Sequence, residues 1–222
     1  MKKIFAFILL THCLSAIYGQ KNNSNLRSGQ MYNYHPILSS NTNAFQTPDK
    51  KIDGTRFVLN DFANNGKVFV SGKVYITKGL NIDAFNNDVV FKLNNDSILI
   101  LEKSVIDSLS IGGHKFKKQI DNNLHEVLWQ KGNATLFKTF FCQIQKGHTN
   151  VMKGTTENDK YKLSHHYYLK KDEAIVKSFD LGTKSILSLF GDKQKQVKKY
   201  IKYNNLNMKD EKDVIKVISY FF

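Results

Sequence analysis

The chain has 222 residues, of which 41% are hydrophobic, and it carries a formal net charge of +14 at pH 7. This length is sufficient for an ordinary hydrophobic core. Beyond the first residues no apolar run approaches the ~18 residues of a membrane-spanning helix, which excludes such a helix from the rest of the chain.

Residues 1–19 predict a secretory signal peptide. Lys2 and Lys3 form a positive start, and Ile4–Leu10 form an apolar run too short to cross a bilayer. Small residues follow the apolar run, as a cleavage site requires, and we expect cleavage after Gly19. We expect an exported protein that is periplasmic, associated with the outer membrane or secreted.

The two cysteines predict no disulfide. Cys13 lies inside the signal peptide, and because His12 before it is not small, the segment is a poor match to a lipoprotein signal. Cleavage leaves Cys142 alone, so no intrachain disulfide can form. The exported chain must be stabilised by its core.

Residues 20–50 are polar, rich in Asn and Ser, and without clear periodicity. This composition is typical of a flexible lead-in. Tyr32, Tyr34 and Ile37 could attach the lead-in to the folded body.

Residues 51–180 predict a β-rich body, because short alternating apolar runs are separated by turn residues. The first expected strands are TRFVLN and the pair within GKVFVSGKVYI. Three hairpins follow: NDVVFKL with ILIL across NNDS, LHEVLWQ with ATLFKTFFCQIQ across KGN, and KLSHHYYLK with AIVKSF across KDE. We interpret KGHTNVMKGTTENDK as a polar loop.

Residues 181–222 predict a helical segment, because the apolar period changes from two to three or four. Thr183 is expected to cap the first helix, and Gly191 and Asp192 to separate it from the second. Asn207 and Asp210 resemble the capping box of a third helix. The residues expected to be buried are Val197, Ile201, Val214 and Ile218.

Lysines surround the apolar stripe of the second helix. They form a possible anion-contact face of Lys193, Lys195, Lys198, Lys199 and Lys202. The favoured interpretation is a solvated helix face. The alternatives are electrostatic contact with an anionic envelope surface and the binding of a specific ligand.

Nucleic acid is not an expected partner. Beyond the signal peptide the chain has only two arginines, Arg27 and Arg56, and arginine is the residue suited to bidentate phosphate contacts. The sequence also lacks a motif that exposes aromatic residues beside glycines, as an RNA-binding sheet requires. The positive charge is therefore no evidence for nucleic-acid binding.

Candidate catalytic and metal-binding residues are scattered. His165 and His166 are adjacent on an expected strand and therefore point to opposite faces, so they cannot easily share a metal. Apolar neighbours of Cys142 favour a packed thiol over a nucleophile. We expect no cofactor and no metal.

The acids Asp61, Asp96 and Asp107 lie in turn-like segments. Paired acids can hydrolyse glycosides, but nothing in the sequence places these three together. Motifs of phosphate-binding loops, serine hydrolases and zinc proteases are absent from the sequence.

The order of several motifs is similar to that of small uncharacterised exported proteins of Gram-negative bacteria. The similarity runs through GTRFVLNDFANNGKVFV, NNDVVFKLNNDSILILEK, ATLFKTF and HHYYLKK to the C-terminal residues. It is carried best by Leu187, Asp192, Tyr200, Ile201, Leu206 and Asp213. This resemblance implies secretion, a β-rich body with a lysine-rich helical end, and no assigned activity.

The sequence therefore predicts an α+β fold that is mainly β. We expect an antiparallel meander or partly closed, barrel-like sheet with two to three C-terminal helices. The leading functional hypothesis is a non-catalytic envelope protein that binds another protein, a glycan or an anionic surface. The alternatives are a hydrolase assembled from dispersed acids or histidines and a structural component of an envelope assembly.

Overall fold

The computed structural model describes residues 52–93, 98–119, 121, 123–152, 154–172 and 174–222. The expected signal peptide, the whole of the expected lead-in, and Asp96 lie outside the described residues. None of the helices among the described residues is long and apolar enough to cross a membrane.

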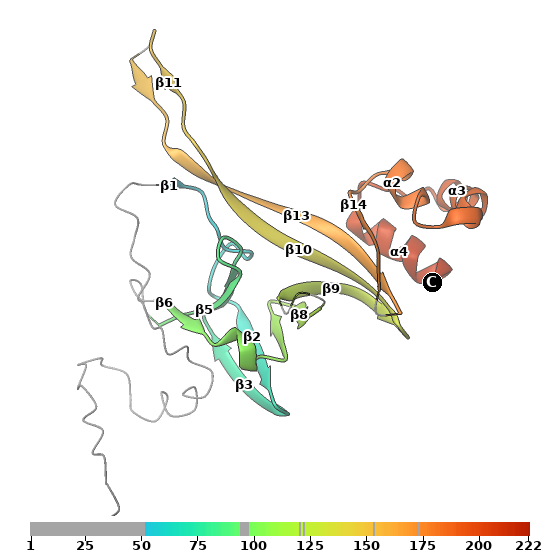
Figure 1. The fold of residues 1–222 in the computed structure, drawn as a ribbon, viewed down its shortest axis with the longest axis horizontal. Coiled ribbons are helices and arrows are strands. Elements are labelled where there is room, and N and C mark those ends of the chain that lie inside the picture. The colour runs from blue at the N-terminus through green and yellow to red at the C-terminus, as the bar shows by residue number, and fades with distance from the viewer. Residues whose placement is uncertain (1–51, 94–97, 120, 122, 153, 173) are drawn as a thin grey trace, which may run out of the picture.

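The described part of the chain is mainly β, with helices at its C-terminal end (Figure 1). The strands are β1 (Ile52–Asp53), β2 (Asn65–Val70), β3 (Lys73–Lys78), β4 (Leu80–Asp83), β5 (Asp88–Lys92), β6 (Ile98–Leu101), β7 (Ser108–Ile111), β8 (His114–Lys118), β9 (Leu124–Lys131), β10 (Ala134–Gln145), β11 (Thr149–Asn150), β12 (Thr155–Thr156), β13 (Asp159–Lys171) and β14 (Ala174–Phe179). The helices are η2 (Lys103–Val105), α2 (Thr183–Leu187), η3 (Gly191–Lys193), α3 (Gln194–Tyr203) and α4 (Glu211–Phe221), of which the η helices are 3-10 helices. The expected α+β, mainly β fold is confirmed.

A large sheet of nine strands organises the body, in the order β1-β13-β10-β9-β8-β7-β2-β3, with β14 also pairing with β13. Its pairs are antiparallel except that β1 runs parallel to β13. The sheet is therefore mixed, and its described strands do not close into a barrel. β4, β5 and β6 form a separate small sheet.

Tight turns join the paired strands, and the β7–β8 hairpin, which was not predicted from the sequence, shows their geometry. Gly112 and Gly113 join β7 to β8 with φ angles of +57° and +89°, which is the type I′ geometry that matches the twist of paired strands. Hairpins β2–β3, β5–β6, β9–β10 and β13–β14 fall at the expected segments.

Two hydrophobic cores lie on one face of the large sheet. Residues directly opposite one another across strands point to the same face, and one such row runs through Val68, Leu109, Phe116, Glu126, Lys138, Tyr167 and Phe179. At one end of the row β2, β7 and β8 pack with the small sheet. At the other end β10, β13 and β14 pack with the helices. The polar residues of the row therefore lie between the two cores.

The helical core agrees with the predicted apolar stripes. Val197, Ile201, Val214 and Ile218 are all buried, and they pack with Leu136, Leu169 and Phe179 of the sheet. In Figure 1 the helices lie together beside the β14 end of β13.

Three local predictions are wrong. The segment TRFVLN is not a strand: Phe57 makes only an isolated bridge with Asp83, because side-chain contacts hold the main chain nearby in a loop. The expected polar loop contains the short pair β11 and β12, which extends the long β10–β13 ribbon (Figure 1). Gly182 rather than Thr183 occupies the position before α2, and it provides no side-chain cap.

The other helix boundaries also shift. Gly191 and Asp192 belong to η3, so Lys193 directly precedes α3, again without a side-chain cap. The third helix begins at Glu211, where the Asp210 carboxylate accepts from the Lys212 N–H at 2.8 Å. Asn207 instead caps the turn before α4, with Oδ1 accepting from the Lys209 N–H at 3.0 Å.

Candidate functional site

The lysine face predicted on α3 is exposed to solvent. Four of its five lysines lie within α3, and at about 100° per residue Lys195, Lys198, Lys199 and Lys202 occupy one sector about 100° wide. All five lysines are exposed, and none makes an ion pair with an acid among the described residues. The structure thus presents an unneutralised strip of positive charge beside the buried stripe of Val197 and Ile201.

The acids at the start of α4 do not neutralise this face. Asp210 caps its own helix, and Glu211 bonds to Lys138 and Tyr167 on the sheet. Asp213 Oδ1 pairs with Lys216, and its Oδ2 accepts from the N–H of Asn207. The negative charges that follow the lysines in sequence therefore point to other partners in the fold.

A cavity of about 830 Å³ lies where two hairpin turns meet the helices. Its apolar lining includes Leu189 and Phe190, which are buried, and Phe221. Lysines and aspartates contribute its polar lining, and among them is Lys193 from the predicted face. The structure thus separates Lys193, which lines this cavity, from the four lysines of α3.

A chain of ionisable groups joins the sheet to α4 between the two cores. The ammonium Nζ of Lys138 lies 3.0 Å from Oε2 of Glu126 and 2.8 Å from Oε2 of Glu211. The hydroxyl of Tyr167 donates to the same oxygen of Glu211 at 2.8 Å. Glu126 Oε1 contacts Nδ1 of His114. Five residues from five elements are thereby linked.

Burial makes this chain energetically significant. The side chains of Glu126 and Lys138 are only 6% and 12% exposed, and Glu126 Oε2 accepts no aligned hydrogen bond, so its contact with Lys138 is purely an ion pair. Burial alone lowers the pKa of Lys138, but the hydrogen bond to Glu211 and the negative charge of Glu126 outweigh it and raise that pKa above its ordinary value. Burial and the bond to Glu211 raise the pKa of Tyr167. Lys138 is thus charged and Tyr167 neutral at pH 7.

A groove of about 510 Å³ lies at the outer end of this chain. Its lining combines the start of β8, with Gly113, His114, Lys115 and Lys117, and the stretch of β9 from Glu126 to Gln130. His114 is the last residue of this chain of ionisable groups, and its half-exposed imidazole lines the groove.

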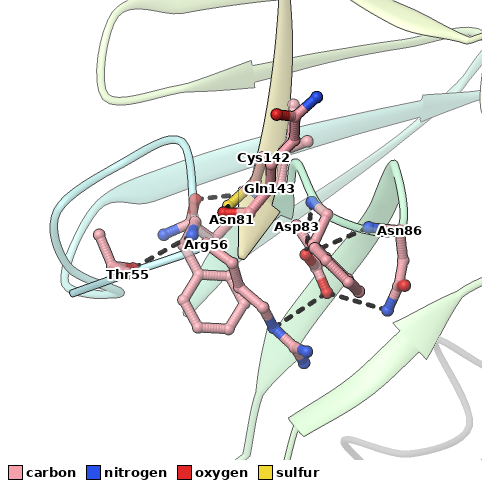
Figure 2. Close-up of polar contacts among 10 residues, drawn as sticks. Thr55, Arg56, Asn81, Asp83, Asn86, Cys142 and Gln143 are labelled. Atoms are coloured by element: carbon pink, nitrogen blue, oxygen red, sulfur yellow. Dashed lines mark hydrogen bonds and ion pairs between the residues drawn. The ribbon is translucent and has the colours of Figure 1, made fainter. Parts of the chain in front are cut away.

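A second buried polar network holds the loop before β2 against the small sheet (Figure 2). Asp83, fully buried, pairs with Nε of Arg56 at 3.2 Å and accepts from the N–H of Phe85 at 2.9 Å. Asn81, also fully buried, accepts from the N–H of Leu59 and donates to its carbonyl. These contacts explain why TRFVLN is not a strand.

The pKa of Asp83 is raised chiefly because the carboxyl is buried, and Arg56 opposes the rise. Asp88 also has a raised pKa, again chiefly from burial. Neither acid lines the two cavities described above. The raised pKa values therefore reflect a structural anchor and do not mark a cleft.

Cys142 packs as a small hydrophobic residue, as expected. Its side chain is buried beside this anchor (Figure 2), and the N–H of Cys142 donates to the carbonyl of Ala84. Burial raises the pKa of the thiol, which disfavours the thiolate that a nucleophile requires.

The adjacent histidines of β13 point to opposite faces, as predicted. His165 contacts the rings of Phe140 and Tyr167, whereas His166 stacks on Phe141 with ring centroids 4.9 Å apart. Among the described residues no three His, Cys, Asp or Glu side chains gather as metal ligands.

The predicted acids are turn residues where they are described. Asp61 accepts from the N–H of Ala63, and Asp107 accepts from the N–H of Ser71 at 2.6 Å. The structure does not join them into one polar site.

One hydrogen-bonded chain on the other face of the sheet was not predicted from the sequence. The buried His125 contacts Asp121 through Nε2 at 2.6 Å and Thr139 through Nδ1 at 2.8 Å. These residues come from a loop, β9 and β10, and no sequence motif connects them. The sequence also gave no sign that Glu126, Lys138 and Glu211 meet, because only strand register and helix docking bring them together.

Comparison of the chain with protein-family models, curated proteins and solved structures finds no match. The geometry of these residues is therefore what bears on the protein's function.

Proposed function

We propose that the protein is an exported, non-catalytic interaction module of the cell envelope, and that α3 contacts an anionic envelope surface. The observation that carries this proposal is the exposed sector of Lys195, Lys198, Lys199 and Lys202, whose neighbouring acids on α4 have other partners. Export is inferred from the expected signal peptide and from the resemblance to exported proteins.

The contact is electrostatic. Lysines are compact, strongly hydrated charges that suit a diffuse anionic surface better than bidentate recognition of one group. Such contacts are screened at high ionic strength, so salt should release the protein.

The test is fractionation of native cells, a salt wash of the membranes and immunodetection of the chain. We expect the wild type to sediment with membranes at low salt and to be released at high salt. A variant with Lys195, Lys198, Lys199 and Lys202 changed to Gln should stay in the soluble fraction. The matched control removes four other exposed lysines, Lys67, Lys73, Lys78 and Lys162, and should sediment like the wild type.

Equal loss in both variants would show that net charge, and not the α3 face, causes binding. A wild-type protein that remains soluble at low salt would contradict the proposal altogether. The lysines of α3 would then be a solvated helix face only.

A hydrolase is the second candidate, and one observation favours it. Asp121, His125 and Thr139 are linked in the order acid, base and hydroxyl, which is the pattern of an activated nucleophile. It ranks second because Thr139 lines neither cavity. Hydrolysis of p-nitrophenyl acetate that disappears in His125→Gln and in Thr139→Val would support the hydrolase, whereas equal rates in all three proteins would exclude this chain of residues.

A further inference from the structure

Strand β9 extends past the strand that pairs with its outer edge. β8 pairs with β9 only through Phe116–Lys118 and Leu124–Glu126. On its other side β9 continues to pair with β10 as far as Lys131. The outer edge of residues 127–131 therefore has no neighbouring strand in the described part of the chain.

The register identifies main-chain groups that are open at this edge. The two-residue turn Gly132–Asn133 closes on Lys131 and Ala134, so that pair is hydrogen-bonded and the next pair, Gln130 and Thr135, is not. The N–H and C=O of Gln130 consequently point away from β10. Outside the β9–β10 ladder, no main-chain hydrogen bond of either group is found among the described residues.

The 510 Å³ groove lies along this open edge. One wall is the β9 stretch of Val127–Gln130, and the other is the beginning of β8 after the Gly112–Gly113 turn. An open strand edge inside a groove has the shape that an extended main chain requires.

The charge of the groove is positive. Lys115 and Lys117 are exposed and line it, and Lys131 follows at the end of β9. The only acid in its lining, Glu126, is paired with Lys138. Lysines on both molecules disfavour pairing between two copies of this chain, whereas an acidic strand is attracted.

We propose that the groove binds an extended acidic segment of a partner protein, which adds as a strand to the outer edge of β9. Main-chain bonds to groups such as those of Gln130 give affinity, and Lys115 and Lys117 select acidic side chains. The inference rests on the proposed role as an interaction module, but it uses a surface other than α3.

The probe is a fluorescein-labelled peptide, Glu-Thr-Glu-Val-Glu-Thr-Glu, with blocked ends. Two further peptides have the same sequence and carry N-methyl groups on alternate amides. One is methylated along one edge of the strand, and the other along the opposite edge. N-methylation removes main-chain donors and leaves every charge in place, so it separates strand addition from electrostatic attraction.

We expect the unmodified peptide to bind, and at least one methylated form to bind about tenfold more weakly for one or two lost main-chain hydrogen bonds. Gln130→Pro removes an outward N–H at an edge position that tolerates proline and should weaken binding similarly. Gln130→Ala is the matched control and should bind like the wild type. Circular dichroism verifies that both variants fold.

Equal affinity for all peptides would overturn the proposal, because charge alone would explain the binding, and so would the absence of binding. If Gln130→Pro does not fold, the affinities of the wild type for the unmodified and N-methylated peptides still test strand addition. The variant with four α3 lysines changed to Gln should bind the peptide normally. Failure of the α3 proposal and failure of this one are therefore distinguishable.

Discussion

Removal of the Lys138 ammonium is the most informative test of the ion-pair chain between the two cores. Lys138→Met keeps an unbranched side chain as far as Cε and removes the charge that lies 3.0 Å from Glu126 and 2.8 Å from Glu211. Glu126 is then left as a buried carboxylate, 6% exposed, with His114 as its remaining ionic contact.

The expected cost follows from burial. Breaking a buried pair by removing one partner costs about 3–5 kcal/mol. Glu211 is 32% exposed and can be hydrated, so we expect the lower end, about 3 kcal/mol. For a protein of this size that loss lowers Tm by roughly 6–12 °C.

The assay is urea unfolding at pH 7, monitored by circular dichroism and by the fluorescence of the single tryptophan, Trp129. The double variant Glu126→Leu, Lys138→Met tests the cause, because it removes both charges. Replacing a buried pair with apolar residues is often nearly neutral, so its free energy of unfolding should lie within about 1 kcal/mol of the wild type.

A Lys138→Met protein as stable as the wild type would refute this account. Additive losses in the double variant would also refute it, because they would show that packing of the two side chains, and not their charge interaction, supplies the stability.

Three further predictions concern stability. Ile201→Ala should lower the free energy of unfolding by about 2–5 kcal/mol, since Ile201 is buried in the helical core, and a variant that melts like the wild type would contradict that packing. The pKa values of Tyr167 and Lys138 are raised in the folded protein, so their contribution to the free energy of unfolding is complete below their ordinary pKa values of 10.0 and 10.5 and is lost as the pH rises beyond them. Urea titrations at pH 8 and at alkaline pH should therefore show a smaller fall in the free energy of unfolding for Tyr167→Phe than for the wild type. An identical fall would argue against a buried tyrosine. Asp83→Ala should destabilise the protein by about 3 kcal/mol, because it removes the ion pair with Arg56 and an acceptor for the N–H of Phe85. Asp83→Asn keeps the acceptor and should cost less, so equal thermal melting of the two variants would contradict this role.

Part of the candidate site was predictable from local sequence. The exposure of Lys195 and Lys199 followed from the helical period, because the apolar positions of α3 could face only the core. The position of Lys193 at a cavity was not predictable, since the cavity is formed by hairpin turns more than twenty residues away in the chain. The partners of the α4 acids could not be predicted either. Glu211 favours a helix start locally, but only the docking of α4 on β9 and β10 brings it to Lys138.

The sequence by itself determined the mainly β body, four of the hairpins and the buried stripes of the helices. Each of these depends on residues close together in the chain, where side-chain period and turn geometry act directly. Only the tertiary structure decided that Glu126, Lys138 and Tyr167 form one row across three strands, and that β8 ends before β9 does. Such features depend on register and on strand length relative to a neighbour, which are set by the packing of the whole sheet.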